Sequence, residues 1–190
     1  MVLLKRRDIL LIYFCAAGSF ALFSSVFNYL PFRLGSPPFN FSTEMTTLFY
    51  LAYVVGIFMG PTAGKVSNHL GSGNTLIAGS VVLGGALILL LQPSIYAVIA
   101  GLLSLCAGFF TIHAAAVGAL NRKLAGGQGR ANALYVMFYY MGGWVGITVC
   151  GIAYKQGEWS AVVSVCLFLL IIPISAGIAE RRISKQAASA

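Results

Sequence analysis

Six long apolar runs constrain this 190-residue chain more than any other feature of its sequence. A helix that crosses the hydrocarbon core of a bilayer needs about 20 mainly apolar residues. Runs of about this length span residues 9–30, 44–64, 75–92, 95–120, 131–154 and 159–179. Only 8 % of the residues are charged, against about 25 % in soluble domains. Because a backbone in lipid must satisfy its hydrogen bonds internally, we predict an all-α, polytopic membrane protein with six transmembrane helices.

The distribution of basic residues predicts how these helices are oriented. If the chain starts in the cytoplasm and the spans alternate, ten of the twelve basic residues fall on the cytoplasmic side. The exceptions are Arg33 and Lys155. This bias follows the positive-inside rule, so we predict that both termini are cytoplasmic. Topology also explains the net charge of +8 without a nucleic-acid partner.

The polar stretch GPTAGKVSNHLGSGN, residues 60–74, separates two of the apolar runs. A phosphate-binding loop would read G-x-x-x-x-G-K-[ST]. Here only three residues separate Gly60 from Gly64, and Val66 stands where that loop needs a magnesium-binding hydroxyl. The stretch is rich in turn-forming residues. We therefore predict that residues 65–74 form a ten-residue cytoplasmic turn.

The same stretch resembles a loop of the major facilitator superfamily. In each six-helix half of that family, the loop between the second and third helices reads G-[KR]-[LV]-x-D-R-x-G-R-[RK]. Gly64, Lys65 and Gly71 match this pattern. Asn68 stands at its acidic position and His69 at its arginine, so the resemblance does not extend to a charge relay in this loop.

Three further segments resemble the second half of bacterial sugar- or drug-efflux permeases in this superfamily. Residues 26–34, 105–117 and 127–146 are similar to parts of helices seven, ten and eleven. The resemblance implies that residues 1–182 form one six-helix half with a 3+3 inverted repeat, and that 183–190 form a disordered cytoplasmic tail. It also implies export of a small organic solute across a bacterial inner membrane by alternating access, with antiport against protons as one option.

Span 2 and span 5 carry small residues at helical spacing. The two stripes consist of Ala52, Gly56, Gly60 and Gly64, and of Gly142, Gly143 and Gly146. Small residues let two helix backbones approach closely in a membrane. The stripes therefore pack either within the six-helix unit or at a seam with a second half, and the resemblance favours the seam. The second half would be a missing N-terminal half or another copy of this chain.

Spans 1 and 4 carry polar side chains that we predict to line a solute cavity. These residues are Ser24, Asn28, Thr111 and His113. Polar groups at membrane depth are costly unless they face a cavity or a partner. His113 could exchange protons or bind a polar solute, or it could be a neutral imidazole that bonds a nearby group. Asn28 could bind solute or satisfy the backbone before Pro31.

Other patterns bear on the class of function. The four cysteines form no metal-ligand pattern, so we expect neither a metal nor a cofactor. Arg130 is predicted to cap the start of span 5, with a cytoplasmic gate contact as the alternative. An intramembrane hydrolase would pair a serine with a histidine, but Ser72 lies in the predicted turn, away from His113. We therefore expect a transporter in the lipid bilayer and not an enzyme, with a non-transporting membrane partner protein as the alternative.

Overall fold

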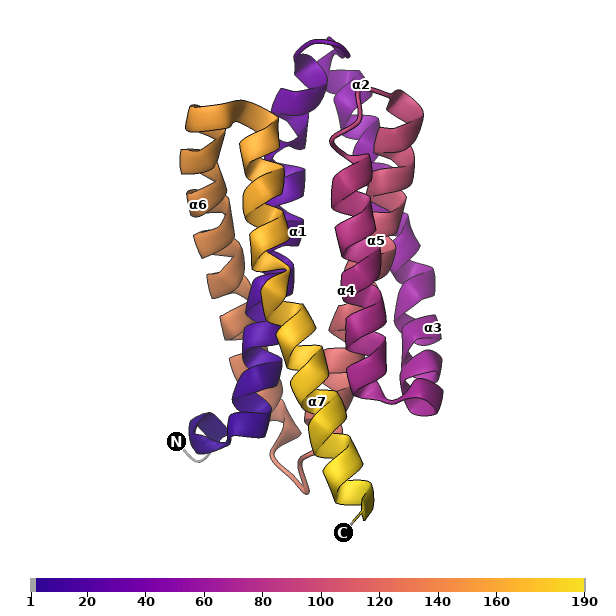
Figure 1. The fold of residues 1–190 in the computed structure, drawn as a ribbon, viewed down its shortest axis with the longest axis vertical. Coiled ribbons are helices and arrows are strands. Elements are labelled where there is room, and N and C mark those ends of the chain that lie inside the picture. The colour runs from indigo at the N-terminus through magenta and orange to yellow at the C-terminus, as the bar shows by residue number, and fades with distance from the viewer. Residues whose placement is uncertain (1–2, 190) are drawn as a thin grey trace.

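The computed structural model describes residues 3–189, with side chains described through residue 186, as a bundle of long helices (Figure 1). In chain order the elements are the 3-10 helix η1 (Leu3–Lys5), α1 (Arg7–Gly35), α2 (Thr43–Leu48), the 3-10 helix η2 (Phe49–Val54), α3 (Val55–Leu70), α4 (Ser72–Leu89), α5 (Ile95–Arg122), α6 (Gln128–Leu169) and α7 (Ile171–Ser189). No strand occurs in this described part of the chain. The all-α prediction is confirmed.

The chain passes along the bundle six times, although its long apolar helices make only five uninterrupted stretches among the described residues. The segments α2, η2 and α3 follow one another without a break and form the second pass. The last stretch, Gln128–Gln186, reverses direction at the upper end in Figure 1. There Gly157 and Glu158 leave the helical conformation. They divide α6 into a first arm (residues 128–156) and a return arm (159–169) that leads into α7.

A single glycine, and not the predicted ten-residue turn, connects α3 to α4. Gly71 has a φ of 81°, a left-handed conformation that glycine adopts without steric cost. Asn74 Nδ2 donates to Leu70 O at 2.8 Å and so satisfies a carbonyl at the end of α3. The prediction for residues 65–74 was wrong because polar side chains at a helix end can bind the helix backbone and need no loop.

The last pass is longer than its apolar run. The predicted disordered tail starts at residue 183, but α7 continues as a helix to Ser189, and Ala190 lies outside the described residues. The helix is interrupted at Leu170, three residues before Pro173. Proline lacks a backbone donor and its ring crowds the preceding turn, which accounts for the break. The pass is therefore a kinked helix and not a span followed by a loose tail.

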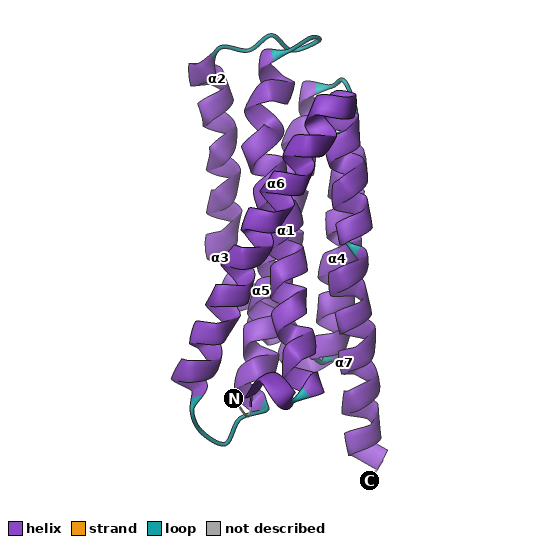
Figure 2. Ribbon diagram, turned by 90° about the vertical axis from the view of Figure 1, so that its left-hand side faces the viewer, coloured by secondary structure: helices purple, strands orange, loops and turns teal. Residues whose placement is uncertain are grey.

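α1 and α5 lie at the centre of the bundle, and the other helices pack around them. α1 contacts α6, α7 and α5, whereas α5 also contacts α3 and α4. α4 in turn packs on α7. The connections between passes lie at the two ends of the bundle, as Figure 2 shows. Apart from the break at Leu170, the middle therefore consists of helices, as a hydrocarbon environment requires.

One end of the bundle holds both termini, the α3–α4 turn and the α5–α6 connection (Figure 1). Its basic residues are Lys5, Arg6, Arg7, Lys65, Arg122, Lys123, Arg130, Arg181, Arg182 and Lys185. We call it the basic end. Arg33 and Lys155 belong to the opposite end, since they lie near the ends of the first and fifth passes. That the basic end faces the cytoplasm stays a prediction.

Candidate functional site

His113 joins α5 to α6 through its side chain. Its Nδ1 lies 3.1 Å from the hydroxyl oxygen of Tyr135 on the first arm of α6, and the imidazole tautomer decides which of the two groups donates. Tyr135 is buried, whereas His113 is half-buried. One ring nitrogen thus has the structural role that was one of the two alternatives for this residue. Nε2 makes no hydrogen bond to any described residue.

Aromatic rings continue from this pair across α1. Phe20 of α1 stacks on Tyr139 of α6, with ring centroids 3.7 Å apart. Tyr139 in turn lies 5.6 Å from the His113 ring. Phe23 stacks on Phe109 of α5 at 3.9 Å. These rings fill the space where α1, α5 and α6 meet.

The rings extend to η2 and form a surface. Tyr53 lies 4.4 Å from the ring of Phe27, and the Tyr50 hydroxyl donates to Phe27 O at 2.9 Å. We define the aromatic wall as Phe20, Phe23, Phe27, Tyr50, Tyr53, Phe109, Phe110, Tyr139 and Tyr140. Tyr50, Tyr53 and Tyr140 are exposed, so no described residue covers that part of the wall.

The aromatic wall was missed at the level of the sequence, although a signal for it exists. Residues 20, 23 and 27 of α1 are spaced three and four positions apart, which places their rings on one side of a helix. Residues 50 and 53 repeat the three-residue spacing. The sequence interpretation looked for polar side chains at membrane depth and therefore passed over these aromatic ones.

Ser24, which was predicted to line the cavity, binds its own helix instead, and so does its neighbour Ser25. Ser24 Oγ donates to Phe20 O at 2.6 Å, and Ser25 Oγ donates to Ala21 O at 2.6 Å. Bonds of this kind satisfy a serine inside a membrane helix without any solute. Ser24 is half-buried one turn after Phe20, so it lies beside the aromatic wall. Its donor, however, is already in use.

The other predicted cavity residues lie on different faces. Asn28 is exposed and follows Ser24 by one turn, so these two share a face of α1. Thr111 lies two positions before His113, which places it about 200° away around α5 at 3.6 residues per turn. The two side chains therefore leave α5 in different directions. That both line one cavity stays a prediction.

The glycines of span 5 pack inside the bundle. A Cβ on Gly146 would lie 2.5 Å from Ala21 O of α1, and a Cβ on Gly142 would meet the backbone of Ala17 even more closely. Helix backbones approach this closely only where side chains are absent. The seam prediction was wrong for Gly142 and Gly146, because their close contact is with α1 of the same unit.

The stripe on span 2 divides between two environments. Ala52 is buried, and a Cβ on Gly56 would lie 2.5 Å from the ring of Phe110 on α5. These two residues also pack within the unit, so the seam prediction was wrong for them. Gly60 and Gly64 instead have open space around them. For Gly60 the seam therefore stays a prediction.

Large apolar side chains, and not small ones, form the outer surface of α3 and of the first arm of α6. Ile57 is 69 % exposed, Phe58 is 68 % exposed and Trp144 is 73 % exposed. The second pass is also the least buried of the long apolar helices. We call this surface the open face and define it as Ile57, Phe58, Met141 and Trp144. Lipid or another protein must cover it in a membrane.

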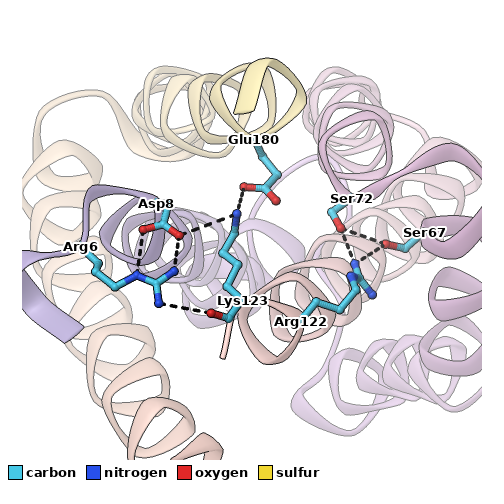
Figure 3. Close-up of polar contacts among 7 residues, drawn as sticks. All are labelled: Arg6, Asp8, Ser67, Ser72, Arg122, Lys123 and Glu180. Carbon is cyan, nitrogen blue, oxygen red and sulfur yellow. Dashed lines mark hydrogen bonds and ion pairs between the residues drawn. The ribbon is translucent and has the colours of Figure 1, made fainter. Parts of the chain in front are cut away.

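Four charged residues form a network at the basic end, where α1 begins, α5 ends and α7 passes (Figure 3). Lys123 Nζ lies 3.0 Å from Glu180 Oε2 and 4.0 Å from Asp8 Oδ2. Arg6 pairs with Asp8 at 2.7 Å and donates to Lys123 O at 3.2 Å. Glu180 is buried, and its Oε2 accepts no hydrogen bond of normal geometry, so the contact with Lys123 is ionic. The network ties the end of α5 to α1 and α7.

Arg122 fixes the turn between α3 and α4 to α5. Its guanidinium donates to the hydroxyls of Ser67 and Ser72 (Figure 3), which lie on either side of Gly71. A serine nucleophile needs a general base within hydrogen-bond reach. Ser72 contacts Arg122 and Ser67 instead of a histidine. The structure therefore gives no support to the hydrolase alternative.

The remaining predicted residues of the loop motif and gate are exposed. Lys65, Asn68 and Arg130 all lie at the surface of the basic end. Neither Lys65 nor Arg130 forms an ion pair with any described residue. A cap or gate role for Arg130 stays a prediction. Gly71 is the member of the motif with a visible role, since it makes the turn.

Comparisons with known proteins agree with this architecture. The chain is 27 % identical over 171 residues to the "Uncharacterized MFS-type transporter YybF" of Bacillus subtilis (strain 168), which covers 90 % of this chain and 41 % of that protein. It is 29 % identical over 164 residues to the "Inner membrane transport protein YnfM" of Escherichia coli (strain K12), which covers 86 % of this chain and 39 % of that protein. The chain resembles one half of a major facilitator superfamily transporter.

This finding confirms the family resemblance predicted from the sequence. This chain spans about two-fifths of the length of the curated relatives that it matches. An uncharacterized transporter of Buchnera aphidicola subsp. Schizaphis graminum (strain Sg) matches over 90 % of the chain at 25 % identity. No family model matches the chain, and no solved structure matches it.

Proposed function

We propose that this chain forms one half of a transporter that moves a small organic solute by alternating access across a bacterial inner membrane. The observation that carries the proposal is the match of nearly the whole chain to about two-fifths of proteins named as transporters. Alternating access requires two units that rock about a central site. Six passes supply one such unit. The second half is either a further part of the same polypeptide or a separate chain.

The aromatic wall is the surface that we propose to face the solute. It has an uncovered side, and Ser24, Asn28 and His113 adjoin it. Aromatic rings offer a large apolar surface and stack on planar groups. Because the serines bind their own helix, most of the binding energy from this half would come from apolar and stacking contacts.

Export and proton antiport are proposed on the resemblance to efflux permeases. The four acidic residues of the chain, Asp8, Glu44, Glu158 and Glu180, all lie near the ends of passes. An embedded proton carrier in this half would therefore be His113. A carboxylate carrier would have to come from the second half.

The open face is where we propose that the second half binds. It lies on α3 and the first arm of α6, and its side chains are large and apolar. A chain that stays alone has nothing opposite its aromatic wall. We therefore propose that this half transports nothing unless it pairs with a second half or with another copy of itself.

Topology is the first property to test. Reporter fusions at Lys65 are expected to read cytoplasmic, and fusions at Arg33 and Lys155 are expected to read periplasmic, because ten of the twelve basic residues lie at the basic end. The measurement is the activity of a paired phosphatase and fluorescent-protein reporter in intact cells. The reverse pattern at all three positions would place the basic end outside and contradict the proposal.

Transport itself is tested with probes of different chemistry. Cells that contain this half together with a second half would be given a labelled pentose, chloramphenicol and ethidium. We expect these cells to accumulate less of at least one probe than cells without the pair. The Tyr139→Ala variant should lower accumulation several-fold less than the unaltered chain does, since an aromatic pair contributes about 0.5–1.5 kcal/mol.

Tyr96→Ala is the matched control, because Tyr96 is 81 % exposed on α5 and lies outside the aromatic wall. An equal loss of transport in the Tyr139→Ala and Tyr96→Ala variants would contradict the role of the aromatic wall. If no probe moves in any assembled pair, the non-transporting partner protein is the better description.

A further inference from the structure

A cavity of about 200 Å³ lies between the start of α4 and the last turns of α7 at the basic end. Its lining residues are Leu70, Gly71, Gly73, Asn74, Arg181, Ser184 and Lys185. The two helices touch beside it, since a Cβ on Gly73 would lie 2.7 Å from the Cα of Arg181. The cavity therefore lies directly beside a close contact between the two helices.

Two cations without acidic partners line this cavity. Arg181 and Lys185 are four positions apart on α7, so they share one face of the helix. The acidic side chains at the basic end, Asp8 and Glu180, pair with Arg6 and Lys123. No carboxylate lines the cavity. Within the described residues, its two positive charges are therefore not neutralised.

The cavity also lies at the boundary between the charged end and the apolar exterior. α4 exposes Val81 and Val82, and α7 exposes Ile171 and Ile178. Ile178 precedes Arg181 by one helical turn. An acyl chain could follow the exposed apolar side chains of α7 while its headgroup lies beside Arg181 and Lys185.

We propose that this cavity binds the phosphate headgroup of an anionic phospholipid from the leaflet at the basic end. Basic pockets between membrane helices recognise such headgroups through the charge of Lys and Arg. The guanidinium of Arg181 suits a phosphate because its planar N–H groups can donate to two oxygens at once. A bound lipid would hold α4 against α7, the two helices that lie away from the aromatic wall. The site is independent of the solute path and of the second half.

The test uses the whole chain in nanodiscs of phosphatidylcholine, with or without about a fifth of phosphatidylglycerol, followed by native mass spectrometry of retained lipid. We expect retention of phosphatidylglycerol over phosphatidylcholine. In an Arg181→Gln, Lys185→Gln variant, that retention should fall about tenfold or more, because both headgroup contacts are lost.

The matched control is Lys5→Gln with Arg7→Gln. It removes the same charge from the same end at two exposed residues outside the cavity, and it should lower retention by less than about twofold. A second control exchanges the two cations, Arg181→Lys with Lys185→Arg. It should retain phosphatidylglycerol as the unaltered chain does, which would show that α7 tolerates substitution at these positions.

Three results would overturn the proposal. Equal losses in the cavity variant and the control would mean that diffuse surface charge attracts the lipid. Unchanged retention in the cavity variant would mean that the cavity is not the site. If millimolar inorganic phosphate displaced all of the retained phosphatidylglycerol, the ligand would be a soluble anion and not a membrane lipid.

Discussion

A Gly146→Leu variant is expected to lose the six-pass bundle. A Cβ at this position would lie 2.5 Å from Ala21 O, and that atom belongs to the backbone of α1, which cannot rotate away. The first arm of α6 and α1 would have to separate along their contact. Overpacking costs about 1–3 kcal/mol and sometimes more, and we expect the upper end because the clash falls on backbone. The measurement is the melting temperature and the yield of monodisperse protein in detergent.

Gly60→Leu is the matched control for this prediction. It makes the same change in another pass, but nothing lies near a Cβ at Gly60. We expect normal insertion and an unchanged melting temperature, together with weaker association with the second half if Gly60 lies at the seam. A Gly146→Leu variant that melts like the unaltered protein would contradict the close packing of α1 and α6.

Lys123→Met is expected to lower the free energy of unfolding by about 3–5 kcal/mol, the cost of leaving a buried charge without its partner. Methionine keeps most of the side-chain volume but removes the ammonium that lies 3.0 Å from Glu180 Oε2. Glu180 is buried and has no other ion pair in the described structure. Asp8 is affected less because Arg6 still binds it. Thermal or chemical denaturation in detergent micelles measures the loss.

Glu180→Gln in the Lys123→Met background should recover a large part of this stability, since it removes the unpaired charge. The double-mutant cycle gives the coupling energy of the pair. Lys65→Met serves as a control at the same end, where an exposed lysine without an ion pair should change stability by less than about 0.5 kcal/mol. Additive effects of the Lys123 and Glu180 substitutions would show that the two side chains do not depend on each other.

The sequence alone was sufficient for the class of the protein and for its passes. The six apolar runs each match the thickness of a bilayer, and a helix is the only structure in which such a run can satisfy its own backbone. The grouping of ten basic residues also follows from alternation of the passes. These properties depend on residue type along one segment, so no knowledge of tertiary contacts was needed.

The ends of helices were less predictable because they depend on single backbone groups. The polar residues after Gly64 suggested a long turn, yet α3 continues to Leu70 and only Gly71 departs from the helix. Asn74 binds back to Leu70 O, and Arg122 from a distant helix binds Ser67 and Ser72. Whether polar residues near a helix end form a loop or a last helical turn depends on these partners.

The partners of each residue were decided by the tertiary structure alone. Periodicity correctly predicted that Gly142 and Gly146 allow close packing, but it could not show that the helix they meet is α1 of the same unit. His113 was recognised as an embedded polar residue, whereas its contact with Tyr135 depends on how α5 and α6 lie together.

The same holds for the ion pair of Lys123 with Glu180, which joins residues 57 positions apart in the chain. A sequence determines which face of a helix is small, aromatic or charged, because side-chain direction repeats every 3.6 residues. Which two faces meet is a property of the whole bundle, since all six passes must bury their faces together. For this reason the aromatic wall became visible only once the helices were placed side by side.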